Sequence, residues 1–282
     1  MIPEKRFPSK QFPLKIWMIL AVFCVAMPIW AASTDVLLLL PGFPGTAEQA
    51  QPYVDKMLRY LEGELSLAPG SMHGVFLTDG AEASSKLTSM QPGLALLGPS
   101  IYAASSGKMK MKVIARLTAN GRGEQQYHVI VKKAGPDSLN ALTGTVSGTV
   151  VHDDKYVLNV LLDGKVPAGK LIFQPNPRPL RALRGLASGK VDAVIVDDET
   201  LNYMGELEFA ADLKKIYTTE PVPAPVVVVM NDGLPKAKQM KAALVGLCKG
   251  DSGKALCESL TISSITAASD ADYKSLLKRY NR

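Results

Sequence analysis

The 282-residue sequence lacks the short motifs that mark common catalytic sites. It has no GxSxG nucleophile elbow, no phosphate-binding P-loop and no GxGxxG dinucleotide fingerprint; Gly121-Arg122-Gly123 is a lone glycine pair in a polar turn. Its three histidines, His73, His128 and His152, have no paired-ligand spacing, so zinc is unsupported. We therefore expect a protein that is not an enzyme and that uses no metal ion or cofactor.

Long runs of one charge, low-complexity tracts and short-period repeats are also absent. The formal charge is +6, and it falls to +3 when the N-terminal segment, with four basic residues and one acidic residue, is set aside. No run of Lys and Arg is interleaved with aromatic residues, so nucleic acid is not an expected partner.

The N-terminal segment has the three parts of a secretory signal peptide. Four basic residues precede an apolar core from Ile16 to about Ala26, and small residues follow at positions 31–33. The core is short and Pro28 follows it closely, which argues against the alternative of an uncleaved membrane anchor. We expect a signal peptide over residues 1–32 and a soluble periplasmic protein.

Two cysteines follow the predicted signal peptide, Cys248 and Cys257, in the segment CKGDSGKALC. In an oxidising compartment, two nearby thiols joined by a glycine-containing turn are expected to form a disulfide. The alternative is two small buried apolar side chains; a metal site is disfavoured because no histidine lies near them in sequence.

Helical patterns alternate with short apolar runs that are typical of buried strands. From Asn176 a capped helix with Pro177 in its first turn is followed by a strand at Val191–Val196. A similar unit comes earlier, with a strand at Leu94–Leu97, and the C-terminal part reads as helical. The alternation predicts an α/β fold, and two similar units imply two lobes.

Ligands of open parallel sheets bind beyond the carboxyl ends of the strands. Polar and aromatic residues at the predicted strand ends and helix starts are therefore the candidate ligand contacts. They are Phe43, Thr78, Asp79, Ser100, Tyr102, His152, Asp153, Asp154 and Asp197.

The acidic candidates have a second interpretation. Asp79 is equally well explained as a helix cap. The pairs Asp153-Asp154 and Asp197-Asp198 are consistent with a cation site or an acid and base, but also with one helix cap beside a solvated neighbour.

Several motifs occur in the order seen in a known family. They are LALLGPSIYAAS, YHVIVKKAG followed by SLNALTG, ALRGLASGKVDAVIVDD, PVPAPVVVV and ITAASDADYKSLLKRY. In this order and spacing the chain resembles the periplasmic phosphate, phosphite and phosphonate-binding proteins of ABC transporters, over nearly its whole length after the predicted signal peptide.

The resemblance implies a type II periplasmic-binding-protein fold, in which two lobes, each a mostly parallel sheet flanked by helices, close on a small solute. Lobe 1 is expected to take residues 35–126 and 226–282, and lobe 2 residues 127–225. The implied partners are a small-molecule solute and the membrane permease of an ABC transporter, with the binding protein itself a monomer.

The sequence departs from the family at the expected ligand cradle. Thr78-Asp79 and Tyr102 match family positions, but the aromatic residue that usually follows the Thr-Asp pair is Gly80 here. The Ser/Thr-rich turn at the start of the first lobe 2 helix is replaced by residues 152–155, HDDK, whose two carboxylates repel an anion. We therefore expect a solute other than a phosphonate; the alternative is a sensory or partner-binding module on the same fold.

Overall fold

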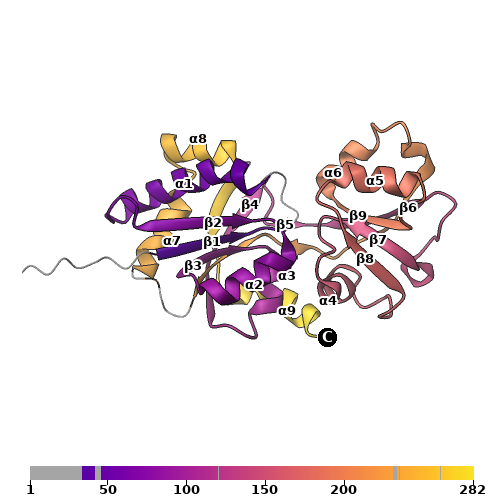
Figure 1. Ribbon diagram of the computed structural model, residues 1–282, viewed down its shortest axis with the longest axis horizontal. Helices are drawn as coiled ribbons and strands as arrows, with labels where there is room; N and C mark the ends of the chain where they lie inside the picture. Colours follow the sequence, from indigo (N-terminus) through magenta and orange to yellow (C-terminus); the bar gives the residue numbers. More distant parts are fainter. Residues whose placement is uncertain (1–33, 42–45, 120, 231–233, 235, 261) are drawn as a thin grey trace, which may run out of the picture. The chain divides into compact units, whose positions relative to one another are not determined.

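The computed structural model describes residues 34–41, 46–119, 121–230, 234, 236–260 and 262–282. The predicted signal peptide and Phe43 lie outside the described residues. Two sheets of five or more strands, each with helices packed on it, account for the fold (Figure 1). The predicted α/β class is confirmed.

The first sheet has six strands in the order β13-β4-β12-β3-β1-β2. The strands are β1 (Thr34–Leu39), β2 (Met72–Leu77), β3 (Leu94–Leu97), β4 (Met111–Ala119), β12 (Val226–Met230) and β13 (Ile262–Ala267). β1 pairs in parallel with β2 and β3, whereas β12 and β13 run antiparallel to their neighbours. The prediction that the C-terminal part is helical is therefore incomplete, because β13 adds an edge strand there.

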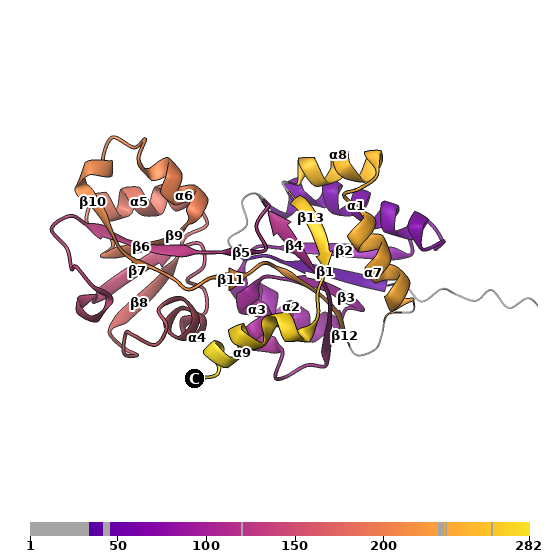
Figure 2. The same ribbon diagram turned by 180° about the vertical axis from the view of Figure 1, so that it is seen from behind.

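Helices cover both faces of this sheet (Figures 1 and 2). One face carries α1 (Ala47–Glu64), α7 (Ala237–Gly246) and α8 (Asp251–Ser259); the other carries α2 (Gly80–Met90), α3 (Pro99–Ser105) and α9 (Lys274–Tyr280), which follows a 3-10 turn, η4 (Asp270–Tyr273). Both faces of the strands are therefore buried, which explains the continuous apolar runs: Leu37 and Leu39 pack on one side, Val36 and Leu38 on the other.

The second sheet has five strands in the order β10-β6-β9-β7-β8. They are β6 (Tyr127–Lys132), β7 (Gly144–Gly148), β8 (Leu171–Pro175), β9 (Ala193–Asp197) and β10 (Leu213–Thr218). β7 pairs in parallel with β8 and β9, and β6 runs antiparallel to β9 and β10. In each sheet most strands run in one direction, four of six in the first and four of five in the second, but both sheets are mixed because antiparallel pairs make up three of five and two of four neighbouring pairs.

The helical segments of the second sheet are shorter. Helices α5 (Pro179–Ala187) and α6 (Asp198–Met204) enclose a core that includes Leu183, Leu186 and Val194. On the other face α4 (Asp154–Tyr156) continues as a π-helical turn, η2 (Val157–Leu161), whose buried Val157, Val160 and Leu161 satisfy the apolar face expected of a helix here. Single turns, η1 (Leu139–Ala141) and η3 (Ala210–Asp212), complete this part.

The chain passes between the two sheets twice. On the way out it forms β5 (Glu124–Gln125), which pairs in antiparallel fashion with β11 (Val222–Pro223) of the returning segment. The strands of the first sheet come from residues 34–119, 226–230 and 262–267 of the chain. Those of the second sheet come from residues 127–218. This distribution supports lobe boundaries at 126/127 and 225/226, which we keep as a proposal; the two sheets with their helices are called lobe 1 and lobe 2 below.

A disulfide joins the end of α7 to α8. Cys248 and Cys257 are bonded, with their Cα atoms 5.6 Å apart, which confirms the predicted pair. Across the described ranges, no helix combines the length and the hydrophobicity that a membrane crossing requires.

Candidate functional site

In lobe 1, the carboxyl ends of β2 and β3 lead directly into α2 and α3. Asp79 lies between β2 and α2, and its Oδ1 accepts a hydrogen bond from the backbone N–H of Glu82 at 3.0 Å, so it caps the helix. Thr78, partly exposed, directly follows the last residue of β2. Ser100 follows Pro99 in the first turn of α3 and is buried, with 5% of its surface exposed. Of the lobe 1 candidates, Thr78, Asp79 and Ser100 thus lie at strand ends as predicted.

In lobe 2, the acidic candidates act as helix caps. Asp153 Oδ1 accepts from the backbone N–H of Tyr156 at 3.0 Å, which caps α4, and Asp197 Oδ1 accepts from Thr200 N–H at 2.8 Å, which caps α6. Asp154 is exposed beside the first cap. Asp153-Asp154 thus includes one helix cap beside an exposed neighbour, and a ligand-binding role for these carboxylates stays a prediction.

One candidate from lobe 2 meets two helix starts of lobe 1. His152 Nε2 lies 2.8 Å from Ser100 Oγ, within hydrogen-bonding distance. The same imidazole packs against Gly80, where an added Cβ would lie 2.6 Å from His152 Cδ2. A side chain at position 80 would overlap the imidazole, so this packing requires glycine there.

The environment of His152 favours a neutral ring. Burial lowers its pKa from the ordinary value of 6.5, while the backbone of Thr149 and the carboxylates of Asp153 and Asp79 oppose this shift without reversing it. Within the described part of the chain, Nδ1 makes no hydrogen bond of normal geometry. A neutral imidazole with one nitrogen engaged by Ser100 can accept or donate a further hydrogen bond.

Tyr102 has a different environment. Its side chain is buried and packs edge to face on Tyr273, with ring centroids 5.2 Å apart. Burial, together with the charge of Asp270, raises the pKa of Tyr102 to about 12. Tyr273 in turn donates a hydrogen bond to the Ala224 carbonyl at 2.9 Å, on the segment that returns to lobe 1. Tyr102 thus packs α3 against η4, and a contact with a ligand stays a prediction.

A second polar cluster, centred on Asp198, was not among the predicted site residues. Its Oδ1 lies 2.9 Å from His128 Nε2 and its Oδ2 lies 3.1 Å from Arg122 Nη1. His128 Nδ1 lies 3.0 Å from Thr218 Oγ1, so both ring nitrogens have partners. The position of Asp198 directly after Asp197 was the available signal, but sequence spacing does not show that β6 brings His128 beside it.

Electrostatics in this cluster favour the ionised carboxylate. Partial burial alone would raise the pKa of Asp198, but hydrogen bonds from His128 and the Gln126 backbone, with the charge of Arg122, lower it overall. Because these partners satisfy both carboxylate oxygens and both histidine nitrogens, the cluster holds the start of α6 against the crossing segment. Within the ranges that the structure describes, no group of three His, Cys, Asp or Glu side chains is placed to hold a metal ion.

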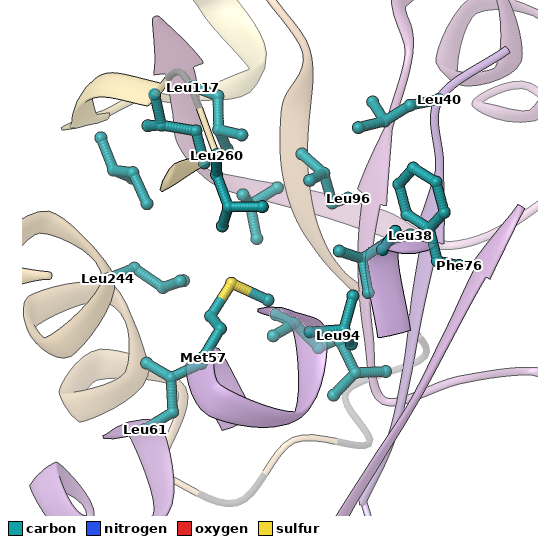
Figure 3. Close-up of a pocket in the computed structure, with 16 residues that line it drawn as sticks. Leu38, Leu40, Met57, Leu61, Phe76, Leu94, Leu96, Leu117, Leu244 and Leu260 are labelled. Atoms are coloured by element: carbon teal, nitrogen blue, oxygen red, sulfur yellow. The ribbon is translucent and has the colours of Figure 1, made fainter. Parts of the chain in front are cut away.

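An apolar cavity of about 80 Å³ lies inside lobe 1, between the sheet and α1 and α7 (Figure 3). All 16 lining residues are apolar, among them Met57 of α1, Phe76 of β2 and Leu244 of α7. A polar solute would lose its hydration there without gaining partners. The cavity is therefore a packing feature of lobe 1 and not the expected solute site.

Comparison with protein families gives a match over most of the chain. The family model described as "ABC transporter, phosphonate, periplasmic substrate-binding protein" matches residues 45–273. No curated protein matches the chain significantly.

Solved structures show where the fold recurs. A Xanthomonas citri protein bound to chloride has 14% identity and a TM-score of 0.69, covering 88% of this chain and 96% of that one. The binding protein component of an ABC phosphonate transporter from Pseudomonas aeruginosa has 14% identity and a TM-score of 0.61, with 87% and 83% covered. PhnD1 from Prochlorococcus marinus, in complex with methylphosphonate, has 12% identity and a TM-score of 0.64, with 89% and 98% covered. At these identities the likeness shows a shared fold.

Proposed function

The chain belongs to the phosphonate family of periplasmic substrate-binding proteins of ABC transporters, and from this premise we propose that it binds its solute where His152 meets Ser100. Members of this family bind small molecules and work with a membrane permease, and they are transporter components, not enzymes. The chain is accordingly a solute-binding protein of an ABC-type importer. Its solute and the residues that contact it are what we propose here.

One observation supports this location above the others. His152, at the start of the first lobe 2 helix, contacts residues at the starts of α2 and α3 in lobe 1. Ligands of open α/β sheets bind beyond the carboxyl ends of their strands, and β2, β3 and β7 end here. Thr78 and Ser100 supply neutral polar groups for a solute at this point.

The charges around this point favour a solute without a strong negative charge. Asp79 and Asp153 both lie near enough to His152 to influence its pKa, and Asp154 directly follows Asp153 in the sequence. Carboxylates at this range repel an anion by Coulomb interaction. We therefore propose that this protein binds methylphosphonate, the molecule found with the Prochlorococcus marinus protein, poorly.

We propose that the signal peptide at residues 1–32 is cleaved, that the mature protein is a periplasmic monomer without nucleic-acid partners, and that it docks on the permease with its solute bound. The mass of the protein recovered from the periplasm tests cleavage, and light scattering tests the monomer.

Calorimetric titration tests the solute class. The probes are methylphosphonate, inorganic phosphate, small primary amines and divalent cations. We expect binding heat from a cationic or neutral probe, and a loss of that affinity by about fivefold in Thr78→Ala, the equivalent of one neutral hydrogen bond. Thr143→Ala, at an exposed threonine of lobe 2, is the matched control. Submicromolar binding of methylphosphonate would contradict the proposed solute class, and no heat from any probe would contradict solute binding at this site.

A further inference from the structure

We propose that the side chain of His152 occupies part of the solute site when no solute is bound. It bridges the two lobes through its contacts with Ser100 and Gly80, so that protein contacts alone hold the lobes together. The side chain must move aside when a solute binds. The inference rests on the proposed location of the solute site. It adds a conformational role that solute binding by itself does not require.

The imidazole of His152 lies against lobe 1. It comes from lobe 2, on the turn after β7, yet its Nε2 hydrogen-bonds with Ser100 of α3 at 2.8 Å and its carbon edge packs on Gly80 of α2. An added Cβ at Gly80 would lie within 2.9 Å of Cδ2, Cγ and Cβ of His152, so the fit extends along the side chain and is not confined to its tip. A solute between these helix starts would compete for the same hydroxyl and the same space.

Asp153, the residue after His152, makes a separate contact with lobe 1. Asp153 Oδ2 accepts a hydrogen bond from the Tyr280 hydroxyl at 3.2 Å, and Lys155 Nζ lies 4.5 Å from the centre of the Tyr280 ring. Tyr280 belongs to α9, which packs with α3 in lobe 1. The turn that carries His152 is therefore held against lobe 1 from a second side.

The C-terminal residues extend this attachment along lobe 2. Asn159 Nδ2 donates to the carbonyl of Tyr280 at 3.0 Å and to that of Arg282 at 3.3 Å, and Arg282 pairs with Asp163. These contacts join α9 to η2, the continuation of the helix that begins beside His152. With both attachments formed, protein contacts alone join the two lobes on this side of the molecule.

The polar chemistry of the bridge is suited to a reversible contact. The hydrogen bond joins two neutral groups, a hydroxyl and an imidazole whose charged form is disfavoured by burial. Such a bond contributes modestly, because both partners regain hydrogen bonds to water when they separate. A solute that offers Ser100 an equivalent partner can therefore replace the imidazole.

Small-angle X-ray scattering of the exported protein tests the bridge. We expect the wild-type protein to keep one small radius of gyration, and His152→Gly to show a larger one because the lobes separate. Free imidazole should restore the small radius in His152→Gly by occupying the space that the substitution creates. His73→Gly, an exposed histidine on β2, is the matched control and should not respond to the substitution or to imidazole.

Two further variants retain His152 and keep the test valid if His152→Gly does not fold. Ser100→Ala removes the hydrogen bond and should raise the ratio of open to closed forms about fivefold. Gly80→Ala should displace the imidazole by steric overlap and open the lobes to at least the same extent. An unchanged radius in all variants that fold would overturn the proposal.

The same proteins separate this inference from the proposed function. If His152→Gly opens the lobes but neither it nor the wild type binds any probe in calorimetry, the bridge stands and solute binding fails. If the wild type binds a probe and no variant opens, solute binding stands and the bridge fails. Tighter binding of the same probe to His152→Gly than to the wild type would support both.

Discussion

The hydroxyl of Tyr280 donates a hydrogen bond to Asp153 Oδ2, and the other oxygen of the same carboxylate caps α4. One side chain of lobe 2 thereby starts a helix and also fixes the last helix of the chain. Burial, with the charge of Asp153, raises the pKa of Tyr280 to about 12, so the phenol stays protonated and remains a donor at any pH at which the protein works. The start of α4 and the C-terminus are coupled through this carboxylate.

Removing the Tyr280 hydroxyl should loosen this coupling without disturbing the packing of its ring. We expect Tyr280→Phe to lower the free energy of unfolding by about 1 kcal/mol, the net value of a hydrogen bond of this kind. Lys155 keeps an aromatic ring beneath it in the variant. Urea unfolding measures the change, and Tyr203→Phe, on an exposed tyrosine, is the control. Equal stabilities of the two variants would show that the contact with Asp153 contributes nothing.

Acidification should weaken the contact of His152 with lobe 1. The charged groups that face the ring are Asp153, from its own turn, and Asp79, from the start of α2; both favour its protonation, but burial outweighs them and lowers its pKa from 6.5. An imidazole released to water regains the ordinary value. Below pH 6.5 the folded protein therefore binds fewer protons at this ring than the unfolded chain does, and its stability falls as the pH drops through 6.5 toward the lowered pKa.

Thermal unfolding at pH values from about 8 down to about 5 measures this dependence, with His152→Gln as a variant that cannot titrate. The advantage of the wild type over His152→Gln should be constant above pH 6.5 and shrink below it. A difference that stays flat, or grows, on acidification would mean that burial does not suppress the charge on His152.

The strands that could be predicted from the sequence are those buried on both faces, because such burial leaves a continuous apolar run in the sequence. Leu94–Leu97 is a continuous apolar run and Val191–Val196 a nearly continuous one, because both lie in sheets that are covered on both faces, and both were predicted as strands. β13, Ile262–Ala267, was missed because it is an edge strand that is only partly buried and is rich in serine and threonine. Its partner, β4, lies more than 140 residues earlier in the chain, and no local pattern reports such a pairing.

In the candidate site too, the sequence predicts local positions but not contacts between segments that are distant in the chain. Position at a strand end selected Ser100 and His152, because the strand pattern is visible in the sequence. It also selected Tyr102, which the helix turns into the core, since a single residue step changes the direction of a side chain on a helix by about 100°. Neither the fit of His152 on Gly80 nor the contact of Asp198 with His128 could be predicted, because each joins segments that are distant in sequence.

The disulfide should contribute to the stability of lobe 1 without affecting the site. Cys248 and Cys257 are nine residues apart, and closing so short a loop in the unfolded chain is worth roughly 2 to 3 kcal/mol. Because Cys257 is buried among apolar side chains, the appropriate variant is Cys248→Ser with Cys257→Ala. Its melting temperature should match that of the reduced wild type and lie below that of the oxidised wild type. α7 and α8 cover the face of the sheet opposite α2 and α3, so probe binding should be unchanged.

The cavity in lobe 1 offers a test of packing in which two adjacent residues should respond in opposite ways. Val227 lines the cavity, whereas Val226, its neighbour on β12, packs into the opposite face of the sheet. Val227→Ile adds one methylene to unfilled apolar space and should stabilise the protein by about 0.8 kcal/mol, while keeping a β-branched residue in a strand. Val226→Ile places the same group into a filled core and should cost about 1 to 3 kcal/mol. Urea unfolding of both variants gives the comparison; a destabilised Val227→Ile would mean that the space seen in Figure 3 cannot accept even one added carbon.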